Sequence, residues 1–128
     1  MAGTPTPYAL AVERRPGYLH VRVSGDNTPE TIERYWRQML EACAEHGMNR
    51  VLIEENLVGP SLRQMQMFEL IDGRPDARPR GVVIAYVDTN PEHDFDRLQF
   101  AETVARNRGF LLQLFRTVRE AEEWLASR

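Results

Sequence analysis

The C-terminal third of the chain alternates short apolar runs with amphipathic segments, and this pattern constrains the fold more than any other feature. Residues 81–87 and 109–115 are the apolar runs, and residues 94–106 between them have the spacing of an amphipathic helix. Two buried strands joined by a helix form a βαβ unit with parallel strands and a right-handed crossover. Residues 117–127 predict a final helix, because Thr117 and Glu120 form a capping box.

The remaining sequence predicts the other elements of an α/β fold. Residues 8–14 and 18–24 indicate a hairpin, whose second strand alternates apolar residues with His20 and Arg22, so one of its faces is expected to be wet. A helix is expected to begin after Thr28 and to end at Gly47. Residues 50–54 predict a central strand, residues 55–60 a loop and residues 61–72 a second helix. The order is ββαβαβαβα, with a mixed, mostly parallel five-stranded sheet and about four helices.

The expected core consists of apolar residues whose spacing matches the period of each predicted strand or helix. Its members are Leu19, Val21, Val23, Ile32, Trp36, Met39, Val51, Ile53, Val83, Ile84, Leu98, Val104, Leu112, Leu114 and Trp124.

Length and cysteine content indicate one domain in a reducing compartment. The 128 residues suffice for a single core, and residues 1–7, with two prolines, are expected to be a frayed tail before a domain over residues 8–128. Cys43 is the only cysteine, so no intramolecular disulfide is possible. The sequence contains no signal-peptide core and no apolar run of membrane length. We therefore expect a cytoplasmic protein without membrane insertion.

The charge distribution argues against nucleic acid as a partner. All 16 basic residues are arginines, and they are scattered through every predicted element. With 19 acidic residues the formal net charge is −3, so no overall positive field attracts nucleic acid or anionic lipid.

The helix expected over residues 61–72 is unusual because large apolar residues surround its whole circumference. A sheet covers only one side of such a helix, so another chain, the N-terminal tail or the connection over residues 73–80 must cover the rest. We expect a protein partner or a homodimer, with an interaction surface made of Leu57, Val58, Met65, Met67, Leu70 and Ile71.

Three segments carry a resemblance to a known family. They are Arg50-Val-Leu-Ile-Glu54, the stretch from Glu102 to Phe110 and the stretch from Phe115 to Leu125. Together with the order of elements, they resemble the STAS domain family and, within it, the bacterial SpoIIAA-like subgroup. The resemblance implies an anti-sigma-factor-antagonist type of fold and a non-catalytic regulatory role.

The resemblance also singles out Ser61. In the antagonists, a Ser or Thr that follows the third strand is phosphorylated by a partner kinase, and Ser61 occupies the matching position. The preceding Asp of that motif is absent, and Gly59 comes before the serine instead of after it. Ser61 with Gln64 is also a capping-box pattern, so Ser61 is either a phosphoacceptor or simply a helix cap.

Glu54, Glu55, Asn56 and Asp88 are the candidate ligand pocket. They lie near the carboxyl ends of predicted strands, which is where open α/β sheets place their ligands. No glycine-rich phosphate loop accompanies them, and we expect no cofactor.

Three further groups of residues have ordinary structural explanations. Glu92, His93, Asp94 and Asp96 form an acidic cluster without a spaced second set of ligands, so no metal is expected. Cys43 lies within an apolar helix stripe, where its thiol is expected to be inert despite the nearby His46. Arg106 and Arg108 lie near the end of a predicted helix, where the helix dipole favours them.

These observations favour a non-catalytic regulatory or protein-interaction domain. The alternative is a carrier of a small apolar ligand or a lipid, based on a distant likeness of the fold to lipid-transfer domains and on a surplus of Met and Phe. Those residues are Met65, Met67, Phe68, Phe95 and Phe100. A small hydrolase ranks last, because Ser, His and Asp are present without a constrained arrangement.

Overall fold

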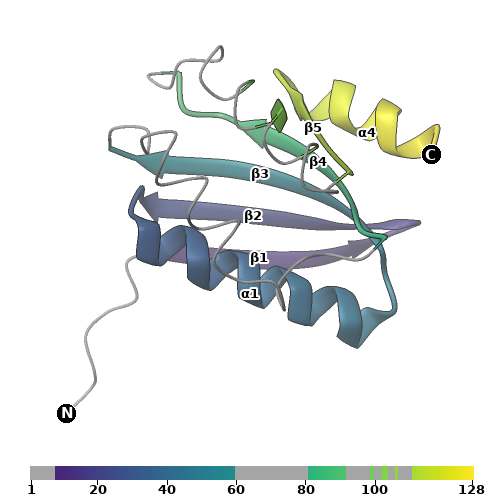
Figure 1. Cartoon of the computed structure of the whole chain (residues 1–128), viewed down its shortest axis with the longest axis horizontal. Coiled ribbons are helices and arrows are strands. Elements are labelled where there is room, and N and C mark those ends of the chain that lie inside the picture. Colours follow the sequence, from purple (N-terminus) through teal and green to yellow (C-terminus); the bar gives the residue numbers. More distant parts are fainter. Residues whose placement is uncertain (1–7, 60–80, 92–98, 100–101, 104–105, 107–110) are drawn as a thin grey trace.

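The elements of the protein follow the expected order along the chain (Figure 1). The structure is a computed structural model that describes residues 8–59, 81–91, 99, 102–103, 106 and 111–128. Its elements are β1 (Tyr8–Arg15), β2 (Tyr18–Asp26), α1 (Pro29–His46), β3 (Arg50–Val58), β4 (Val83–Asp88), β5 (Leu111–Phe115) and α4 (Val118–Ala126).

One five-stranded sheet with the order β1-β2-β3-β4-β5 organises the molecule. The β1 and β2 strands are antiparallel, and all other neighbours are parallel, which confirms the predicted mixed, mostly parallel sheet. Of the four expected helices, α1 and α4 are present within the described part of the chain. The helix expected over residues 61–72 lies outside the described residues. Of residues 94–106, only Gln99, Glu102, Thr103 and Arg106 are described, and all four are helical.

The ends of α1 follow the predicted capping residues. The Thr28 side chain accepts a hydrogen bond from the Thr31 amide at 3.1 Å, and Pro29 occupies the first turn, where its missing amide hydrogen costs nothing. Gly47 ends the helix with a φ of 63°, a left-handed conformation that glycine adopts without a Cβ clash. Local sequence alone therefore determines both ends of this helix.

The third strand is longer than the sequence predicted. Residues 55–58 were expected in a loop, but β3 continues to Val58 and stays paired with β2 as far as Asp26. Ile53, Glu55 and Leu57 alternate along β3 and lie on the same face. The strand pattern was not recognised because Glu55 and the next residue, Asn56, are polar. A buried carboxylate is tolerated in this strand because it finds a hydrogen-bond donor on α1.

The core has one layer on each face of the sheet. α1 packs over β1 and β2 on one face, and α4 packs over β3, β4 and β5 on the other (Figure 1). Of the expected core residues that the structure describes, ten are buried: Leu19, Val21, Val23, Ile32, Met39, Val51, Ile53, Ile84, Leu112 and Leu114. Leu98 and Val104 lie outside the described residues.

Three expected core residues, Trp36, Val83 and Trp124, are only partly buried, so their assignment to the core interior was wrong. Trp36 packs against the core layer on the α1 face, and Trp124 packs against the core layer on the α4 face. Trp124 packs against Phe115 with ring centroids 5.4 Å apart, and the Arg128 guanidinium lies 4.6 Å from the centroid of the Trp124 ring. An indole is large, so it is rarely fully buried even where most of its surface packs against a core.

The helices of the described residues include none that is long and apolar enough to cross a membrane.

Candidate functional site

The carboxyl ends of β3 and β4 bring two of the four predicted pocket residues together. Glu55 and Asp88 are direct partners in the parallel ladder, so both side chains lie on the α1 face of the sheet. Glu54 and Asn56 alternate with Glu55 along β3 and lie on the opposite face. The four residues therefore do not share one face, although all are near the same end of the sheet.

Glu55 is the centre of a buried polar cluster. Glu55 is only 2% exposed. Its Oε2 accepts a hydrogen bond from the hydroxyl of Tyr35, which is fully buried on α1. Tyr86 on β4 also hydrogen-bonds the Glu55 side chain. Burial and then the negative charge of Glu55 raise the pKa of both phenols well above the usual value, so both remain protonated donors. The cluster joins α1 to the middle of the sheet.

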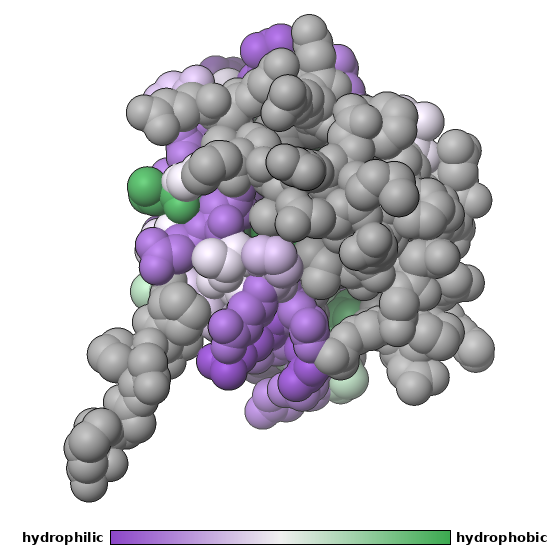
Figure 2. Space-filling model, turned by 60° about the vertical axis from the view of Figure 1, so that its left-hand side comes forward, coloured by the Kyte–Doolittle hydropathy of each residue, from purple (hydrophilic) through white to green (hydrophobic). Residues whose placement is uncertain are grey.

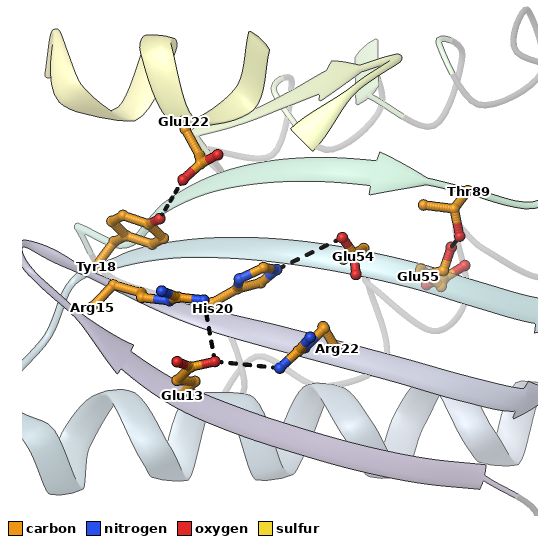
Figure 3. A network of polar contacts seen from close by, with 9 residues as sticks. All are labelled: Glu13, Arg15, Tyr18, His20, Arg22, Glu54, Glu55, Thr89 and Glu122. Atoms are coloured by element: carbon orange, nitrogen blue, oxygen red, sulfur yellow. Dashed lines mark hydrogen bonds and ion pairs between the residues drawn. The ribbon is translucent and has the colours of Figure 1, made fainter. Parts of the chain in front are cut away.

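The loop after β4 fastens the last residues of β3. The amide and the hydroxyl of Thr89 both donate to the Glu55 carbonyl, at 2.7 and 3.1 Å (Figure 3). The buried Asn90 donates through Nδ2 to the Leu57 carbonyl at 2.7 Å, and its amide donates to Asp88 Oδ1 at 2.9 Å. These bonds hold the point from which the chain leaves β3 toward Ser61.

The two members of the predicted interaction surface at the end of β3 lie in opposite surroundings: Leu57 is buried and Val58 is exposed. Leu57 is fully buried in the core, so its assignment to the surface was wrong; it faces the same side of the sheet as Ile53 and Glu55. Val58 is 64% exposed, more than any other large apolar side chain in the described part of the chain. The remaining members, Met65, Met67, Leu70 and Ile71, and the candidate Ser61 lie outside the described residues.

A second polar site, which the sequence did not suggest as functional, lies on the α4 face of β1, β2 and β3 (Figure 3). We call it the polar sheet face, and it consists of Glu13, Arg15, His20, Arg22 and Glu54. Glu13 Oε2 forms ion pairs with Nη2 of Arg15 and with Nη2 of Arg22, each at 3.3 Å. His20 Nε2 lies 3.9 Å from Glu54 Oε1.

His20 is the unusual member of the polar sheet face, because it is only 7% exposed. Burial lowers the pKa of its imidazole, Glu54 opposes this shift, and Arg22 and Arg15 add to it. His20 Nε2 and Arg15 Nε are buried and have no hydrogen-bond partner among the described residues. The alternation of β2 placed His20 on the polar side, but its burial depends on side chains from β1 and β3 that only the strand register reveals.

The other candidates have structural surroundings. Cys43 is buried, and burial raises the pKa of its thiol, which disfavours the reactive thiolate. Arg106 donates to the Leu112 carbonyl at 3.2 Å and to Gln113 Oε1 at 3.1 Å. Arg108 and the cluster Glu92, His93, Asp94 and Asp96 lie outside the described residues. Within the described ranges, no three His, Cys, Asp or Glu side chains gather as metal ligands would.

Comparisons with known proteins connect this fold to solved structures. No protein family model and no curated protein sequence matches the chain. Among solved structures, an anti-sigma factor antagonist from Mycobacterium paratuberculosis matches with a TM-score of 0.63 and 14% identity, over 98% of this chain and 99% of that chain. The protein TM1081 matches with a TM-score of 0.55 and 11% identity, over 100% of this chain and 97% of that chain. The chain therefore has the STAS-like fold that the sequence resemblance predicted.

Proposed function

We propose that the chain is a non-catalytic regulatory domain of STAS type that acts by binding another protein. The observation that carries this proposal is the end-to-end likeness to an anti-sigma factor antagonist, which extends over 98% of this chain. The name of that protein describes an action on another protein. A match over one compact fold without large additions on either side favours a similar mode of action.

The end of β3 is the proposed contact point. Val58 exposes an apolar side chain there, while Asn90 and Thr89 hold the strand on its β4 side. The Val58 carbonyl accepts the Asn27 amide at 2.8 Å from the β2 side. An apolar group on a firmly held backbone loses little entropy on binding, so it can contribute to affinity without ordering costs. Figure 2 brings this end of the molecule forward and shows a mostly hydrophilic described surface with small, separate apolar areas.

Two variants, compared with the wild type, test the contact point. Val58→Glu places a charge at the proposed contact, and Leu111→Glu is the matched control, because Leu111 is a strand residue that is 41% exposed. Wild type and both variants are immobilised, and proteins from the cells that encode the chain are recovered and then purified for direct binding measurements. We expect one stoichiometric partner that binds wild type and Leu111→Glu but binds Val58→Glu at least about tenfold more weakly.

Self-association is measured in the same experiment by sedimentation at micromolar concentration. A dimer that dissociates in Val58→Glu but not in Leu111→Glu identifies a second copy of the chain as the partner. A wild type that stays monomeric and binds no purified protein contradicts the proposal, as does equal weakening by the two substitutions.

Regulation at Ser61 is the finer part of this proposal. Its support is its position three residues after Val58, in the segment that resembles the phosphorylated motif of the antagonists. If Ser61 is only a cap, Ser61→Ala lowers the free energy of unfolding by about 0.5–2 kcal/mol and Ser61→Asp restores it. If Ser61 is a phosphoacceptor, Ser61→Asp changes partner affinity while stability stays near that of the wild type.

A further inference from the structure

The two edge strands of the sheet differ in whether other residues occupy their backbone groups. The sheet begins with β1 and ends with β5 (Figure 1). At β5, the Glu102 carboxylate accepts a hydrogen bond from the Leu114 amide, and Arg106 donates to the Leu112 carbonyl at 3.2 Å. At β1, no described residue outside β2 hydrogen-bonds the backbone. An open edge strand is a template for pairing with another strand.

The register of the hairpin shows which backbone groups of β1 point outward. Arg15 and Tyr18 close a two-residue turn, so they form a hydrogen-bonded pair, and such pairs alternate along the ladder. The odd-numbered residues of β1 therefore bond to β2. By the same alternation, odd-numbered residues of β2 face β3, and the Asn27 amide that follows β2 does donate to the Val58 carbonyl of β3. The residues of β1 with outward amide and carbonyl groups are Tyr8, Leu10, Val12 and Arg14.

The side chains of β1 do little to prevent pairing at this edge. The segment Tyr8–Val12 contains no charged residue and no proline, and the charges of the strand are confined to its last residues. The Val12 side chain is 38% exposed, although it is a large apolar group on the α1 face. Edge strands that stay unpaired commonly carry charged residues, proline or a bulge along their length. The first part of β1 lacks the charges and the proline.

Two copies of β1 complement each other when they pair antiparallel about Ala11. Tyr8 of one copy is then opposite Arg14 of the other, and Leu10 is opposite Val12. Every outward amide and carbonyl of the strand finds a partner in this register, whereas any other register within residues 8–15 leaves some unpaired. The pairing of Leu10 with Val12 also covers the exposed valine with an apolar neighbour.

The charges and sizes of the remaining side chains suit the same register. On the α4 face, Ala11 is opposite the Ala11 of the second copy, and Ala9 is opposite Glu13, so small side chains leave room and no like charges meet. A register centred on Arg14 would instead place two arginines directly opposite each other, which is unfavourable. The sequence of β1 is therefore complementary to itself in one register.

We propose that β1 pairs with β1 of a second copy of the chain, antiparallel and centred on Ala11, so that the two sheets become continuous. The position of α1 leaves room for this arrangement. Because α1 packs over both β1 and β2, its axis lies about one strand spacing from the symmetry axis, and the two α1 helices come to lie about 10 Å apart. Helices pack against each other at this distance, so α1 adds a second contact. The surface is separate from Val58 on β3, and the two proposals can fail independently.

Cysteine substitutions test the register. Ala11 and the Ala11 of the second copy form a non-hydrogen-bonded pair, whose Cα atoms lie about 4.5 Å apart, within the range that a disulfide spans. Ala9 is exposed on the same face of the same strand but lies more than about 10 Å from its own copy. On mild oxidation, Ala11→Cys should form a covalent dimer, and Ala9→Cys should stay monomeric in denaturing gels without reductant. Wild type is a further control, because its Cys43 is buried.

Val12→Pro tests the edge hydrogen bonds. The Val12 amide points outward, so proline removes a bond between the copies and none within the protomer. Symmetry removes this bond twice, so we expect sedimentation to show a dimer that is at least about tenfold weaker than that of the wild type. Val12→Thr keeps the amide and should remain dimeric. Val58→Glu should also remain dimeric, which separates this contact from the one at the end of β3.

Urea unfolding establishes that each variant is folded, and the two cysteine variants decide alone if Val12→Pro is not. Three results would overturn the proposal: a wild type that stays monomeric throughout the micromolar range, equal cross-linking of Ala9→Cys and Ala11→Cys, or a dimer that folded Val12→Pro leaves intact. A dimer that dissociates in Val58→Glu and not in Val12→Pro would likewise assign self-association to the end of β3.

Discussion

Each face of the sheet buries a titratable side chain, and the two side chains differ in their hydrogen bonding. On the α1 face, Glu55 is 2% exposed and accepts a hydrogen bond from the buried Tyr35. On the α4 face, His20 is 7% exposed, and its Nε2 has no hydrogen-bond partner among the described residues. A buried group that is fully paired holds the fold together, whereas a buried group that lacks a partner leaves a hydrogen bond to be made.

The largest expected contrast between the faces is in alkaline solution. The pKa values of Tyr35 and Tyr86 are raised by burial and by the charge of Glu55, so the folded protein keeps protons that the unfolded chain releases above about pH 10. Stability is present below that pH and falls above it, by about 1.4 kcal/mol per pH unit for each phenol. Denaturant unfolding at a series of pH values from 8 to 11 measures the slope. A flat profile would show that the cluster is not closed.

Tyr35→Phe is the next largest effect, because it removes one hydrogen-bond donor from the Glu55 carboxylate, which stays buried. The free energy of unfolding should fall by about 1.5–3 kcal/mol in urea titrations. Tyr8→Phe is the matched control, since the Tyr8 hydroxyl donates to Gln38 in an exposed pair, and the loss there should stay below about 0.5 kcal/mol. Equal losses in the two variants would remove the distinction between the paired interior and the surface.

The helices on the two faces both begin with a threonine N-cap, so the same Thr→Ala substitution in each helix compares the stability that the two caps contribute. Thr28 of α1 accepts the Thr31 amide at 3.1 Å, and Thr117 of α4 accepts the Glu120 amide at 3.2 Å. Each Thr→Ala change should cost about 1 kcal/mol in thermal or urea unfolding. The loss should be larger for Thr28, whose cap is partly buried, than for the exposed Thr117. Serine at either position should restore most of the stability, because its hydroxyl also caps.

A smaller effect is expected in acid, on the α4 face. The pKa of His20 is lowered by burial, so below about pH 6.5 the unfolded chain binds a proton that the folded protein does not yet bind. The contribution of His20 to stability is therefore present above that pH and is lost as the pH falls through the lower folded pKa. Comparison of wild type with His20→Gln between pH 8 and 5 isolates this contribution. A wild type that gains stability relative to His20→Gln on acidification would contradict it.

The smallest effect is a shift in the titration of His20 itself. Among the charged neighbours of His20, Glu54 raises the imidazole pKa most, against the effect of burial, and Arg22 lowers it most. Glu54→Gln should therefore move the imidazole titration to lower pH, and Arg22→Gln should move it to higher pH. Two-dimensional NMR of the imidazole resonances follows each variant. Shifts of the same sign in both variants would contradict these two charge effects, and no shift in either would mean that burial alone sets the His20 pKa.

Local sequence signals predicted much of the fold because they act over a few residues. Thr28, Pro29 and Gly47 mark the ends of α1, and Thr117 marks the start of α4, as the structure confirms. The mostly parallel sheet follows from the alternation of strand and helix patterns. Features that depend on distant partners were not predicted in this way. The continuation of β3 through Glu55 requires Tyr35, which lies 20 residues earlier in the chain.

The candidate site was predicted less well than the fold, for the same reason. Glu55 and Asp88 lie beside each other at the carboxyl ends of β3 and β4, but Glu54 and Asn56 face the other side because β3 continues past the expected loop. Leu57 was expected at the surface and is buried for the same reason. The polar sheet face was missed because its members belong to three strands, and only their register brings them together.

The hairpin of β1 and β2 has a consequence for how the protein can diversify. Four of the five residues of the polar sheet face lie between positions 13 and 22, on two strands joined by a tight turn at Gly17, which has a φ of 85°. The α1 face of the same hairpin, with Leu19 and Val21, carries the core contacts. Exchange of alternate residues in this one short segment would therefore change the charge of the α4 face, while the core contacts, the parallel strands and the end of β3 remain unchanged.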